Sequence, residues 1–388
     1  MIIGHWQRFS TLRPLSSAPM AEKFRVGVIG CGAISGKYLQ TSRMFPILEI
    51  AACADLNRDA AKKKAEEFNI PQVLDVEQLL ADPSIQAVLN LTVPKAHAPI
   101  CQAALDAGKH VYVEKPLAVT RRDGQAIVAK ARKKKLLVGC APDTFLGAGL
   151  QTARKAIDDG LIGNPVAFTA FMMCPGHEHW HPNPEFYYER GGGPMLDMGP
   201  YYLTALLNLL GPIKRLAALA SIAIPNRTIT SQPKCGKKIV VQTPDHVTGV
   251  IEFQQGAVGT MTMSFATRFP QHDQLTPINI FGTEGTLLVP DPNNFGGPVK
   301  LRRKDDKEFS QLPLIFSHKY DRSIGLADMA WAALHGGPLR ANADQALAVL
   351  DAMLGFLDSS RTGKAYKPVT RYRRPEPLPA NPPFGVLG

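Results

Sequence analysis

The chain has 388 residues, of which 45% are hydrophobic and 20% charged; this length suits two domains, and this composition excludes a wholly disordered chain or a coiled coil. No apolar run approaches the ~18 residues that cross a bilayer, so we expect no membrane partner. The net charge is +11, but residues 1–20 carry +2 and residues 361–388 carry +5, which leaves the middle of the chain nearly balanced and argues against a nucleic-acid partner.

The first residues and the cysteines indicate where the protein works. Residues 1–22 lack the apolar stretch of a secretory signal, and we interpret them as a disordered or wrongly assigned N-terminal tail. A transit peptide is the alternative, because residues 1–20 have arginine and serine without acidic residues. The six cysteines form no CxxC pair and no zinc spacing, which is typical of reduced thiols in a cytoplasmic protein.

From Phe24 onward, short apolar runs alternate with helical stretches. The apolar runs predict buried strands at residues 24–30, 47–55, 86–91, 110–114 and 136–140. Strands that alternate with helices at this spacing are typical of a parallel sheet. We therefore predict an α/β fold whose N-terminal domain, residues 23–143, is a doubly wound parallel sheet of the Rossmann type.

The regular alternation of short strands and helices ends near residue 145. We expect one helix over residues 145–159, a strand over 165–173 and a last long helix over 343–359. Two antiparallel hairpins turn at residues 254–256 and 282–285. These elements predict a second, α+β domain with an open, mainly antiparallel sheet over residues 144–370, followed by a Pro-rich basic tail over 371–388.

The first strand runs straight into a glycine-rich loop, GCGAIS. Gly30 and Gly32 allow a tight turn and the close approach of a pyrophosphate to the backbone. The helix that begins there, with Ala33 and Ile34, offers free N–H groups and the positive end of its dipole. The third position of the fingerprint is Ser35 instead of glycine or alanine, so the motif is weak by itself and depends on its strand–loop–helix context.

An acidic residue at the end of the second strand bears on the choice of cofactor. Asp55 lies 23 residues after Gly32, where a carboxylate typically accepts hydrogen bonds from the adenosine ribose. This position favours NAD(H). Arg58 lies close by and could hold the extra phosphate of NADP(H), so NADP(H) stays the alternative, and a structural Asp55 that caps the next helix is the other interpretation.

A lysine follows the fourth strand in the segment YVEKPLA. Lys115 comes directly after Glu114, at the carboxyl edge of the predicted sheet, where ligands bind in such folds. Pro116 biases Lys115 toward an extended backbone. A lysine there could bond a substrate hydroxyl and, with a lowered pKa, also transfer its proton. Its spacing fits a surface lysine equally well.

A carboxylate and a phenol are predicted on one face of a later helix. Asp197 and Tyr201 are four residues apart, after a triple glycine and Pro194 that suit a helix start. The pair could handle a proton, although a tyrosine pKa near 10 needs a neighbouring cation to be useful at neutral pH. The alternative is an acid at a helix start and a tyrosine in the core.

Three of these segments resemble the Gfo/Idh/MocA family of oxidoreductases, and the similarity covers about residues 24–370. They are GVIGCGAISGKY, NLTVPKAHAPICQAALDAGKHVYVEKPLA and GGGPMLDMGPYYLTALLNLLGP. The resemblance implies a Rossmann domain that binds NAD(H) or NADP(H), and a C-terminal domain that binds substrate and forms oligomers. It also implies cofactor contacts from Thr92, Pro94, His97, Glu114 and Lys115. For His97, a structural role near the helix start is an equal alternative.

The sequence departs from the family at one catalytic position. Many members show Asp-x-x-x-His, in which the histidine is the acid/base, whereas Tyr201 stands in that place here. Glucose–fructose oxidoreductase and the dihydrodiol dehydrogenases are similar in having a tyrosine. The resemblance therefore implies Tyr201 as proton carrier, Lys115 as polariser and relay, and Asp197 as the residue that orients the substrate.

The segment HEHWHPNPEFYYERGGG is rich in histidine. His177, His179 and His181 alternate, as metal ligands on an extended segment would. Proline and asparagine interrupt the segment, however, and no matching ligand pair stands elsewhere, so we predict no metal. Trp180 offers a flat face to a sugar ring, and His181 and Asn183 offer hydrogen bonds, which favours a substrate loop over an ordinary exposed loop.

Together these observations predict an NAD(P)-dependent dehydrogenase or reductase that acts on a CH–OH group of a sugar, sugar derivative or cyclitol. Two alternatives stay open: a dinucleotide-binding sensor without turnover, and an NAD-dependent glycosidase with an internal redox cycle. The predicted open sheet needs its exposed face covered, so we expect a homodimer or homotetramer.

Overall fold

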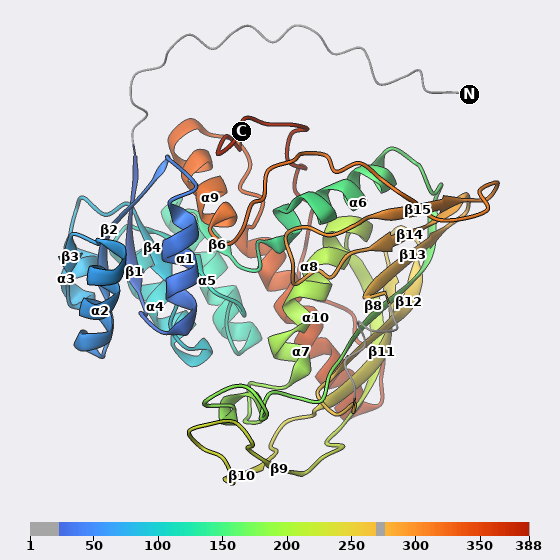
Figure 1. Cartoon of the computed structure of the whole chain (residues 1–388), viewed down its shortest axis with the longest axis horizontal. Helices are drawn as coiled ribbons and strands as arrows, with labels where there is room; N and C mark the ends of the chain where they lie inside the picture. The colour runs from blue at the N-terminus through green and yellow to red at the C-terminus, as the bar shows by residue number, and fades with distance from the viewer. Residues whose placement is uncertain (1–22, 269–275, 388) are drawn as a thin grey trace, which may run out of the picture.

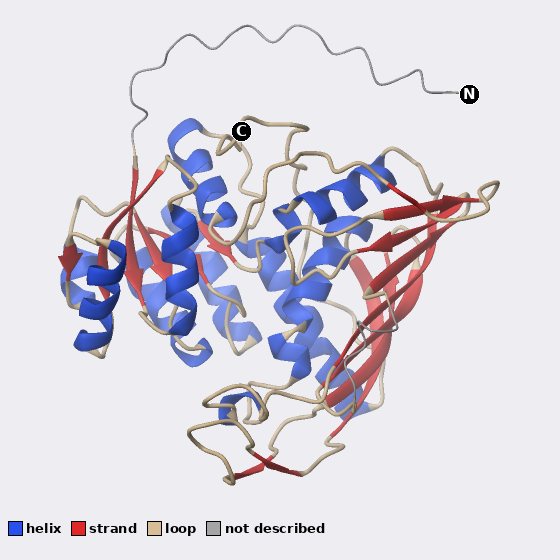
Figure 2. Ribbon diagram, in the orientation of Figure 1, coloured by secondary structure: helices blue, strands red, loops and turns tan. Residues whose placement is uncertain are grey.

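The structure, a computed structural model, describes residues 23–268 and 276–387. The tail predicted over residues 1–22 lies outside the described residues. Two sheets stand side by side with helices packed between them and around the first sheet (Figures 1 and 2). Within the described ranges, none of the helices has the length and apolarity that a membrane span requires.

The first sheet has six parallel strands in the order β3-β2-β1-β4-β5-β6, as predicted for a Rossmann fold. Its strands read as nearly continuous apolar runs because helices cover both faces. The elements are β1 Phe24–Ile29, α1 Ala33–Ser42, β2 Leu48–Ala54, α2 Arg58–Phe68, β3 Gln72–Val73, α3 Val76–Ala81, β4 Ala87–Asn90, α4 Pro94–Asp106, β5 His110–Val113, α5 Arg121–Lys134 and β6 Val138–Cys140.

The second sheet has eight strands in the order β16-β15-β14-β13-β7-β12-β11-β8. Its first elements are η1 Thr144–Leu146, α6 Ala148–Asp158, β7 Pro165–Met173, η2 Glu185–Tyr187, α7 Pro194–Asp197, α8 Gly199–Leu210 and β8 Ile213–Ser221. Then come β9 Asn226–Thr228, β10 Lys238–Val240, β11 His246–Phe253, β12 Val258–Ser264, β13 Ile278–Gly282, β14 Gly285–Val289, β15 Lys300–Arg303, β16 Ser310–Gln311, α9 Ile324–His335 and α10 Ala343–Thr362.

This sheet is mainly antiparallel, and only β7 and β12 pair in parallel. Helices α8 and α10 lie between the two sheets (Figure 1). All residues of α8 are buried, which explains its largely apolar sequence. The opposite face of the sheet carries no helix in the described part of the chain (Figure 2).

Helix α10 joins the two halves of the molecule. It packs against α5 of the first half and against β8 and α8 of the second. Arg121 at the start of α5 pairs with Asp351 at 2.6 Å and with Asp358 at 2.9 Å, both on α10. Because Asp351 is fully buried, this pairing fixes how α10 lies across α5.

One predicted element is wrong in detail. The single helix expected over residues 145–159 is a short 3-10 turn, η1, followed by α6, which begins at Ala148. The two are separated at Gly147, where the backbone of Phe295 passes so closely that a Cβ atom would overlap it. The loop between β14 and β15 therefore decides where this helix begins.

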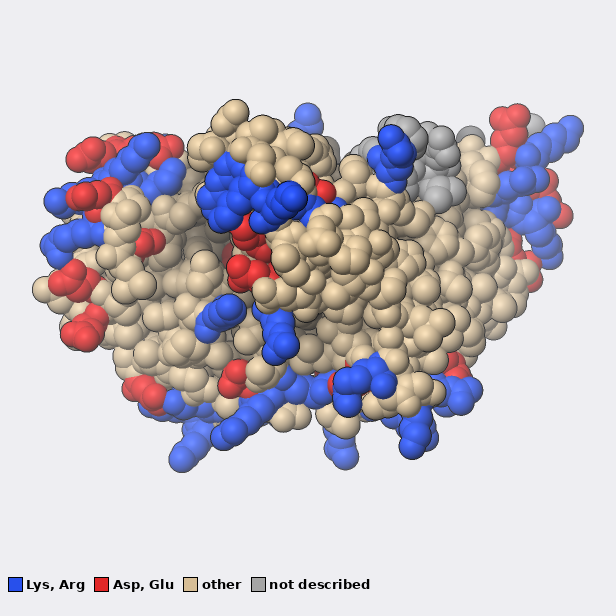
Figure 3. All heavy atoms as spheres, turned by 90° about the horizontal axis from the view of Figure 1, so that it is seen from below, with Lys and Arg blue, Asp and Glu red and all other residues tan. Residues whose placement is uncertain are grey.

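The C-terminal segment 371–387 lies against the body of the molecule. Leu378 and Leu387 are buried, and the carbonyl oxygens of Pro375 and Leu387 accept hydrogen bonds from Arg154 and Arg340 at 2.6 and 2.9 Å. Seen from below, lysine and arginine side chains stand in several separate groups, mostly with acidic side chains nearby (Figure 3). The lysine and arginine side chains visible on this face therefore do not form one continuous basic patch.

Candidate active site

The candidate site lies at the carboxyl edge of the six-stranded sheet. The chain leaves β1, β2, β4 and β5 at this edge, because parallel strands all end on the same side. The strand order reverses direction between β1 and β4, and ligands of open α/β sheets bind outside such a reversal point. Helices α7 and α8 of the second half approach the same edge (Figure 1).

The glycine loop has the geometry of a phosphate cradle. Gly30 has a φ of +104°, and a Cβ atom there would lie 2.6 Å from the carbonyl carbon of Leu91, so only glycine fits. Among the described residues, no side chain caps the start of α1, which leaves its first N–H groups to a ligand. Ser35, at the third fingerprint position, is buried and donates to the carbonyl of Gly32 at 2.7 Å.

Asp55 lies beside this loop, whereas Arg58 is directed elsewhere. One oxygen of the Asp55 carboxylate accepts from the N–H of Cys31 at 2.7 Å, and the other accepts from the N–H of Asn57 at 2.8 Å. Arg58 pairs with Asp75 at 2.7 Å, and both of these side chains are largely exposed. The arrangement leaves the half-buried carboxylate next to the loop and the guanidinium in an exposed ion pair.

His97 connects two loops of the sheet edge. It is buried on α4, the helix that Pro94 opens, and its Nδ1 lies 2.6 Å from the carbonyl oxygen of Pro116. Its Nε2 lies 2.9 Å from the carbonyl oxygen of Thr92, and burial lowers its pKa. Thr92 in turn donates its hydroxyl to Asn90 at 2.7 Å. Both ring nitrogens of His97 thus face backbone carbonyls, and the nitrogen that carries the hydrogen donates to its neighbour, which favours the structural interpretation of this residue.

Lys115 and Asp197 meet across the two halves of the molecule. The ammonium of Lys115 donates to Oδ1 of Asp197 at 2.7 Å and to the main-chain carbonyl of Asp197 at 2.9 Å. Burial disfavours both charges, but each charge stabilises the other. The net effect raises the pKa of Lys115 and lowers that of Asp197. The pKa of Lys115 therefore moves in the opposite direction from the one that a proton relay would need, and the lysine stays a cation.

The helix expected to carry both Asp197 and Tyr201 is interrupted between them. Asp197 ends α7, and α8 begins at Gly199, with Met198 at the junction. The two side chains still share a neighbour, because the Lys115 ammonium that binds Asp197 lies 5.4 Å from the centre of the Tyr201 ring. Lys115 therefore lies next to both residues.

Arg322 is a member of the site that the sequence analysis missed. Its guanidinium donates to the phenol oxygen of Tyr201 at 3.0 Å and to the carboxylate of Glu114 at 3.2 Å. Glu114 also accepts from the hydroxyl of Tyr38 at 2.9 Å. Arg322 lies in the irregular segment before α9, where no periodicity or motif marks it.

Two acidic side chains of the histidine-rich segment, Glu178 and Glu185, are paired with cations. Glu178 binds Arg227 at 2.8 Å, and Glu185 binds Lys234 and Lys237 at 2.7 and 2.9 Å. These pairs attach the segment to the excursion that contains β9 and β10. Within residues 23–268 and 276–387, no group of three or more His, Cys, Asp or Glu side chains is placed to hold a metal ion.

Two of the predicted substrate residues of this segment, Trp180 and His181, contact its first histidine, His177. Trp180 is 55% exposed, and its indole N–H donates to Nδ1 of His177 at 3.2 Å. His181 accepts from the N–H of Asn183 at 3.0 Å, so these two order the loop between them. Nε2 of His177 lies 3.5 Å from Oδ2 of Asp197. This contact brings the loop to the candidate site, and the sequence pattern contained no signal for it.

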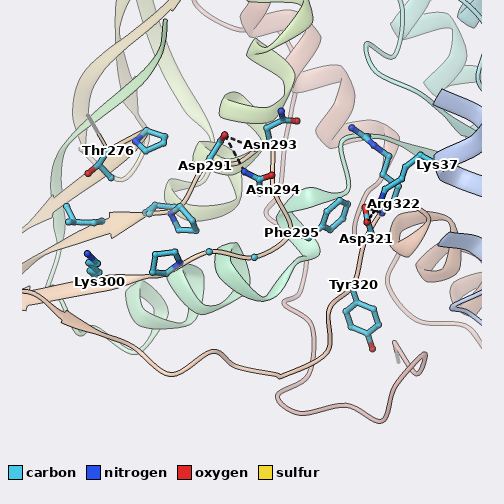
Figure 4. A pocket seen from close by; sticks show the side chains of 17 residues that line it. Lys37, Thr276, Asp291, Asn293, Asn294, Phe295, Lys300, Tyr320, Asp321 and Arg322 are labelled. Carbon is cyan, nitrogen blue, oxygen red and sulfur yellow. Dashed lines mark hydrogen bonds and ion pairs between the residues drawn. The ribbon is translucent and has the colours of Figure 1, made fainter. Parts of the chain in front are cut away.

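A groove of about 1030 Å³ borders the site at Arg322. Figure 4 shows Lys37, Asp321 and Arg322 at one end of the groove and Asp291 and the neighbouring asparagines on the facing wall. Lys37 and Asp321 form an ion pair at 2.5 Å. The groove is therefore polar where it approaches the phenol of Tyr201.

Comparisons with known proteins give a consistent result. Residues 24–141 match the family model described as "Oxidoreductase family, NAD-binding Rossmann fold", and residues 150–288 match the model of the GFO/IDH/MocA C-terminal domain. The 1,5-anhydro-D-fructose reductase of Ensifer adhaerens is 28% identical over 349 residues, which cover 88% of this chain and 97% of that protein.

Two further similarities extend this result. The myo-inositol 2-dehydrogenase of Thermotoga maritima is 24% identical over 267 residues, covering 68% of this chain and 75% of that protein. A solved structure of levoglucosan dehydrogenase, in complex with NADH and levoglucosan, shares the fold with a TM-score of 0.78 at 21% identity, covering 90% of this chain and all of that one. The chain therefore belongs to the Gfo/Idh/MocA family of oxidoreductases, with an NAD-binding Rossmann fold followed by the family's C-terminal domain.

Proposed function

We propose that this oxidoreductase moves a hydride between a nicotinamide cofactor and a CH–OH or carbonyl carbon of a sugar, sugar derivative or cyclitol. The observation that carries this proposal is the Lys115–Asp197 ion pair beside the phenol of Tyr201, at the edge of an NAD-binding sheet. Relatives named as reducing an anhydrosugar or oxidising inositol support the substrate class.

The residues at the sheet edge fit a dinucleotide. Gly30, Gly32 and the N–H groups of Ala33 and Ile34 would hold the pyrophosphate. Asp55 would accept from the adenosine ribose, which favours NAD(H), because its negative charge repels the extra phosphate of NADP(H). Thr92, Pro94 and Glu114 would border the nicotinamide half. The cofactor, when bound, supplies or accepts the hydride at its ring.

The side chains around the reacting oxygen have distinct roles in this proposal. Lys115, fixed as a cation by Asp197, polarises the substrate oxygen. Arg322 can only donate hydrogen bonds, so the Tyr201 hydroxyl hydrogen points away from it and is free for the substrate. When Tyr201 gives this proton to the substrate oxygen, the negative charge left on the phenol lies beside Arg322 and Lys115.

We further infer which domain binds the cofactor, which binds the substrate, and how copies of the chain assemble. Residues 23–143 would bind the cofactor and residues 144–370 the substrate, with Trp180, His181 and Asn183 at the substrate side. A second copy would cover the outer face of the eight-stranded sheet, giving a homodimer or homotetramer. The six free cysteines favour a reducing compartment, the cytoplasm.

The test is a turnover assay with both cofactors. Purified protein is given NAD⁺ or NADP⁺ with myo-inositol, D-xylose or levoglucosan, and NADH or NADPH with 1,5-anhydro-D-fructose, while nicotinamide absorbance is followed. We expect turnover of at least one of these compounds, with NAD(H) preferred. Lys115→Ala should leave cofactor binding nearly intact and lower kcat by about 100-fold or more, whereas Lys63→Ala, an exposed lysine on α2, should change neither.

The same assay separates the alternatives. Cofactor binding without turnover of any sugar would indicate a sensor, and release of sugar from a glycoside without net NADH would indicate a glycosidase with an internal redox cycle. Near-wild-type turnover by Lys115→Ala would overturn the assigned roles.

A further inference from the structure

His177 occupies an enclosed position next to the candidate catalytic residues. The centre of its ring lies 4.2 Å from that of Tyr187 and 4.4 Å from that of Phe265, and its side chain is 12% exposed. These aromatic neighbours come from η2 and from the end of β12. The imidazole is therefore held in one orientation by packing from two separate segments.

The hydrogen bond from Trp180 determines which nitrogen of His177 carries the proton. An indole N–H can only donate, so Nδ1, which receives it at 3.2 Å, must present a lone pair. The hydrogen of the neutral ring then sits on Nε2, an assignment that follows from the hydrogen-bond network. Protonating Nδ1 as well would set two donors against each other and break the bond to Trp180.

The Nε2–H group points at the reaction centre without a partner of its own. It lies 3.5 Å from Oδ2 of Asp197, too far for a well-formed hydrogen bond, and it is buried with no hydrogen-bond partner among the described residues. A buried donor left unpaired destabilises the protein relative to one that has an acceptor. Such a group next to a carboxylate acceptor is suited to receive a ligand atom that can both donate and accept.

We propose that His177 and Asp197 together bind the hydroxyl group on the carbon next to the reacting one. The hydroxyl hydrogen would go to Oδ2 of Asp197, and the hydroxyl oxygen would accept from Nε2–H of His177. This inference rests on the proposed function and narrows its substrates to polyols with a hydroxyl adjacent to the oxidised or reduced carbon. His177 is a substrate-binding donor and no proton carrier, because its hydrogen is held on Nε2.

The position of His177 also bears on the departure from the family pattern. Tyr201 stands where many members carry a histidine on the helix. Here an imidazole reaches the same carboxylate from the loop after β7, on the opposite oxygen from Lys115. The site thus has a fixed neutral donor and a separate phenol, so that substrate binding and proton transfer are assigned to different side chains.

The first test needs no turnover. Nitrogen-15 NMR of histidine-labelled protein, with His177→Asn used to assign the signal, should show His177 as the neutral Nε2–H form near pH 8. Trp180→Phe keeps an aromatic ring but removes the donor, and should give a mixture of the two neutral forms. A wild-type His177 with its hydrogen on Nδ1 would overturn the proposal even if the protein oxidises sugars.

The second test uses the compound of the panel that the wild type turns over and its analogue without the adjacent hydroxyl, which is 2-deoxy-D-xylose in the case of D-xylose. His177→Phe should lower kcat/KM for the full substrate about 10- to 100-fold and lose most of the discrimination against the analogue. His177→Gln, which keeps an N–H donor, should recover part of the loss, and His179→Phe, an exposed neighbour, should have no effect.

The two proposals fail in different ways. If no panel compound is turned over, the proposed function fails, while the NMR measurement still reports on His177. If the wild type is active and His177→Phe discriminates against the deoxy analogue as strongly as the wild type does, the role of His177 is wrong and the proposed function stands. Unchanged NADH binding by His177→Phe shows that this variant is folded. If His177→Phe does not bind NADH, the role of His177 is tested instead by how strongly His177→Gln discriminates against the deoxy analogue.

Discussion

At the residue scale, one carboxylate organises the candidate site. Asp197 is approached by Lys115 on one oxygen and by His177 near the other. Lys115 would need a lowered pKa to pass a proton at neutral pH, yet the carboxylate raises its pKa despite burial. The raised pKa of Lys115 disfavours the relay role that the sequence predicted for it, and Tyr201 stays the proposed proton carrier.

Arg322 gives a residue-scale prediction, because its guanidinium donates a hydrogen bond to the phenol oxygen of Tyr201, the proposed proton carrier. We expect Arg322→Met to lower kcat about 10- to 100-fold, since a phenolate formed at Tyr201 would lose its hydrogen-bonded cation. Arg322→Lys should lose less, because it keeps the charge but cannot bind Tyr201 and Glu114 as a fork. Steady-state kinetics with the active sugar measure both variants.

A double-mutant cycle distinguishes this role from a structural one. In the Tyr201→Phe background, Arg322→Met should cost only about 3-fold or less, because the group on which it acts is already gone. Independent losses that multiply in the double variant would show that Arg322 acts through the fold instead. NADH binding, measured by fluorescence, should stay close to wild type throughout.

At the element scale, a buried carboxylate connects a strand of the first sheet to a helix of the second half. Asp143 joins the end of β6 to the start of α9, because its carboxylate accepts from the N–H of Gly325 at 3.0 Å. It is completely buried, and its Oδ1 has no hydrogen-bond partner among the described residues. Burial raises the pKa of Asp143 from 3.8 to about 6, although Arg322 and the Gly325 N–H oppose this shift.

This shift predicts a pH dependence of stability. The folded state holds the Asp143 proton more tightly than the unfolded state does, so this group makes the free energy of unfolding fall as pH rises from 3.8 to about 6. Asp143→Asn keeps an acceptor for Gly325 and carries no charge. We expect it to lose this fall and to be about 1–3 kcal/mol more stable than wild type at neutral pH.

Urea unfolding at about pH 4.5 and about pH 7 measures this effect. Asp159→Asn, which changes an exposed carboxylate at the end of α6, is the matched control and should keep the wild-type pH dependence. An Asp143→Asn variant that is less stable than wild type at neutral pH would show that the charged form is the stabilising one.

At the scale of the whole molecule, the eight-stranded sheet is covered by helices on one side alone within the described chain. Its outer face is rich in threonine and valine. Val250 and Val258 are 46% and 48% exposed, and the hydroxyls of Thr248 and Thr262 are bonded across β11 and β12 at 2.7 Å. Such a flat and weakly charged surface is suited to a second copy of the chain.

Sedimentation at micromolar concentration tests this assembly. We expect the wild type to sediment as a dimer or tetramer and Val250→Lys to sediment as a smaller species, because two lysines would be buried in a symmetric interface. Val240→Lys changes another exposed valine, on β10 outside the eight-stranded sheet, and should behave as wild type. A monomeric wild type would contradict the proposed interface.

Much of the molecule could be predicted from local sequence patterns. The alternation of strands and helices identified the Rossmann sheet, and the glycine loop, Lys115 and the Asp197–Tyr201 pair were found by spacing and family resemblance. These signals are short-range, because periodicity and motif spacing depend on neighbouring residues. The interruption of the helix at Met198 was missed, although Gly199 and Pro200 follow it directly, and both residue types are unfavourable inside a helix.

Only the tertiary structure decided which charges and hydrogen bonds act together. Arg322 reaches Tyr201 from 121 residues away, and His177 lies near Asp197 from a loop that the sequence pattern predicted to bind substrate through other residues. Such partners are set by how distant elements pack, and no local periodicity carries that information. Sequence patterns thus identified the cofactor fold and the catalytic candidates, whereas packing placed Lys115 against Asp197, Arg322 against Tyr201 and His177 near the same carboxylate.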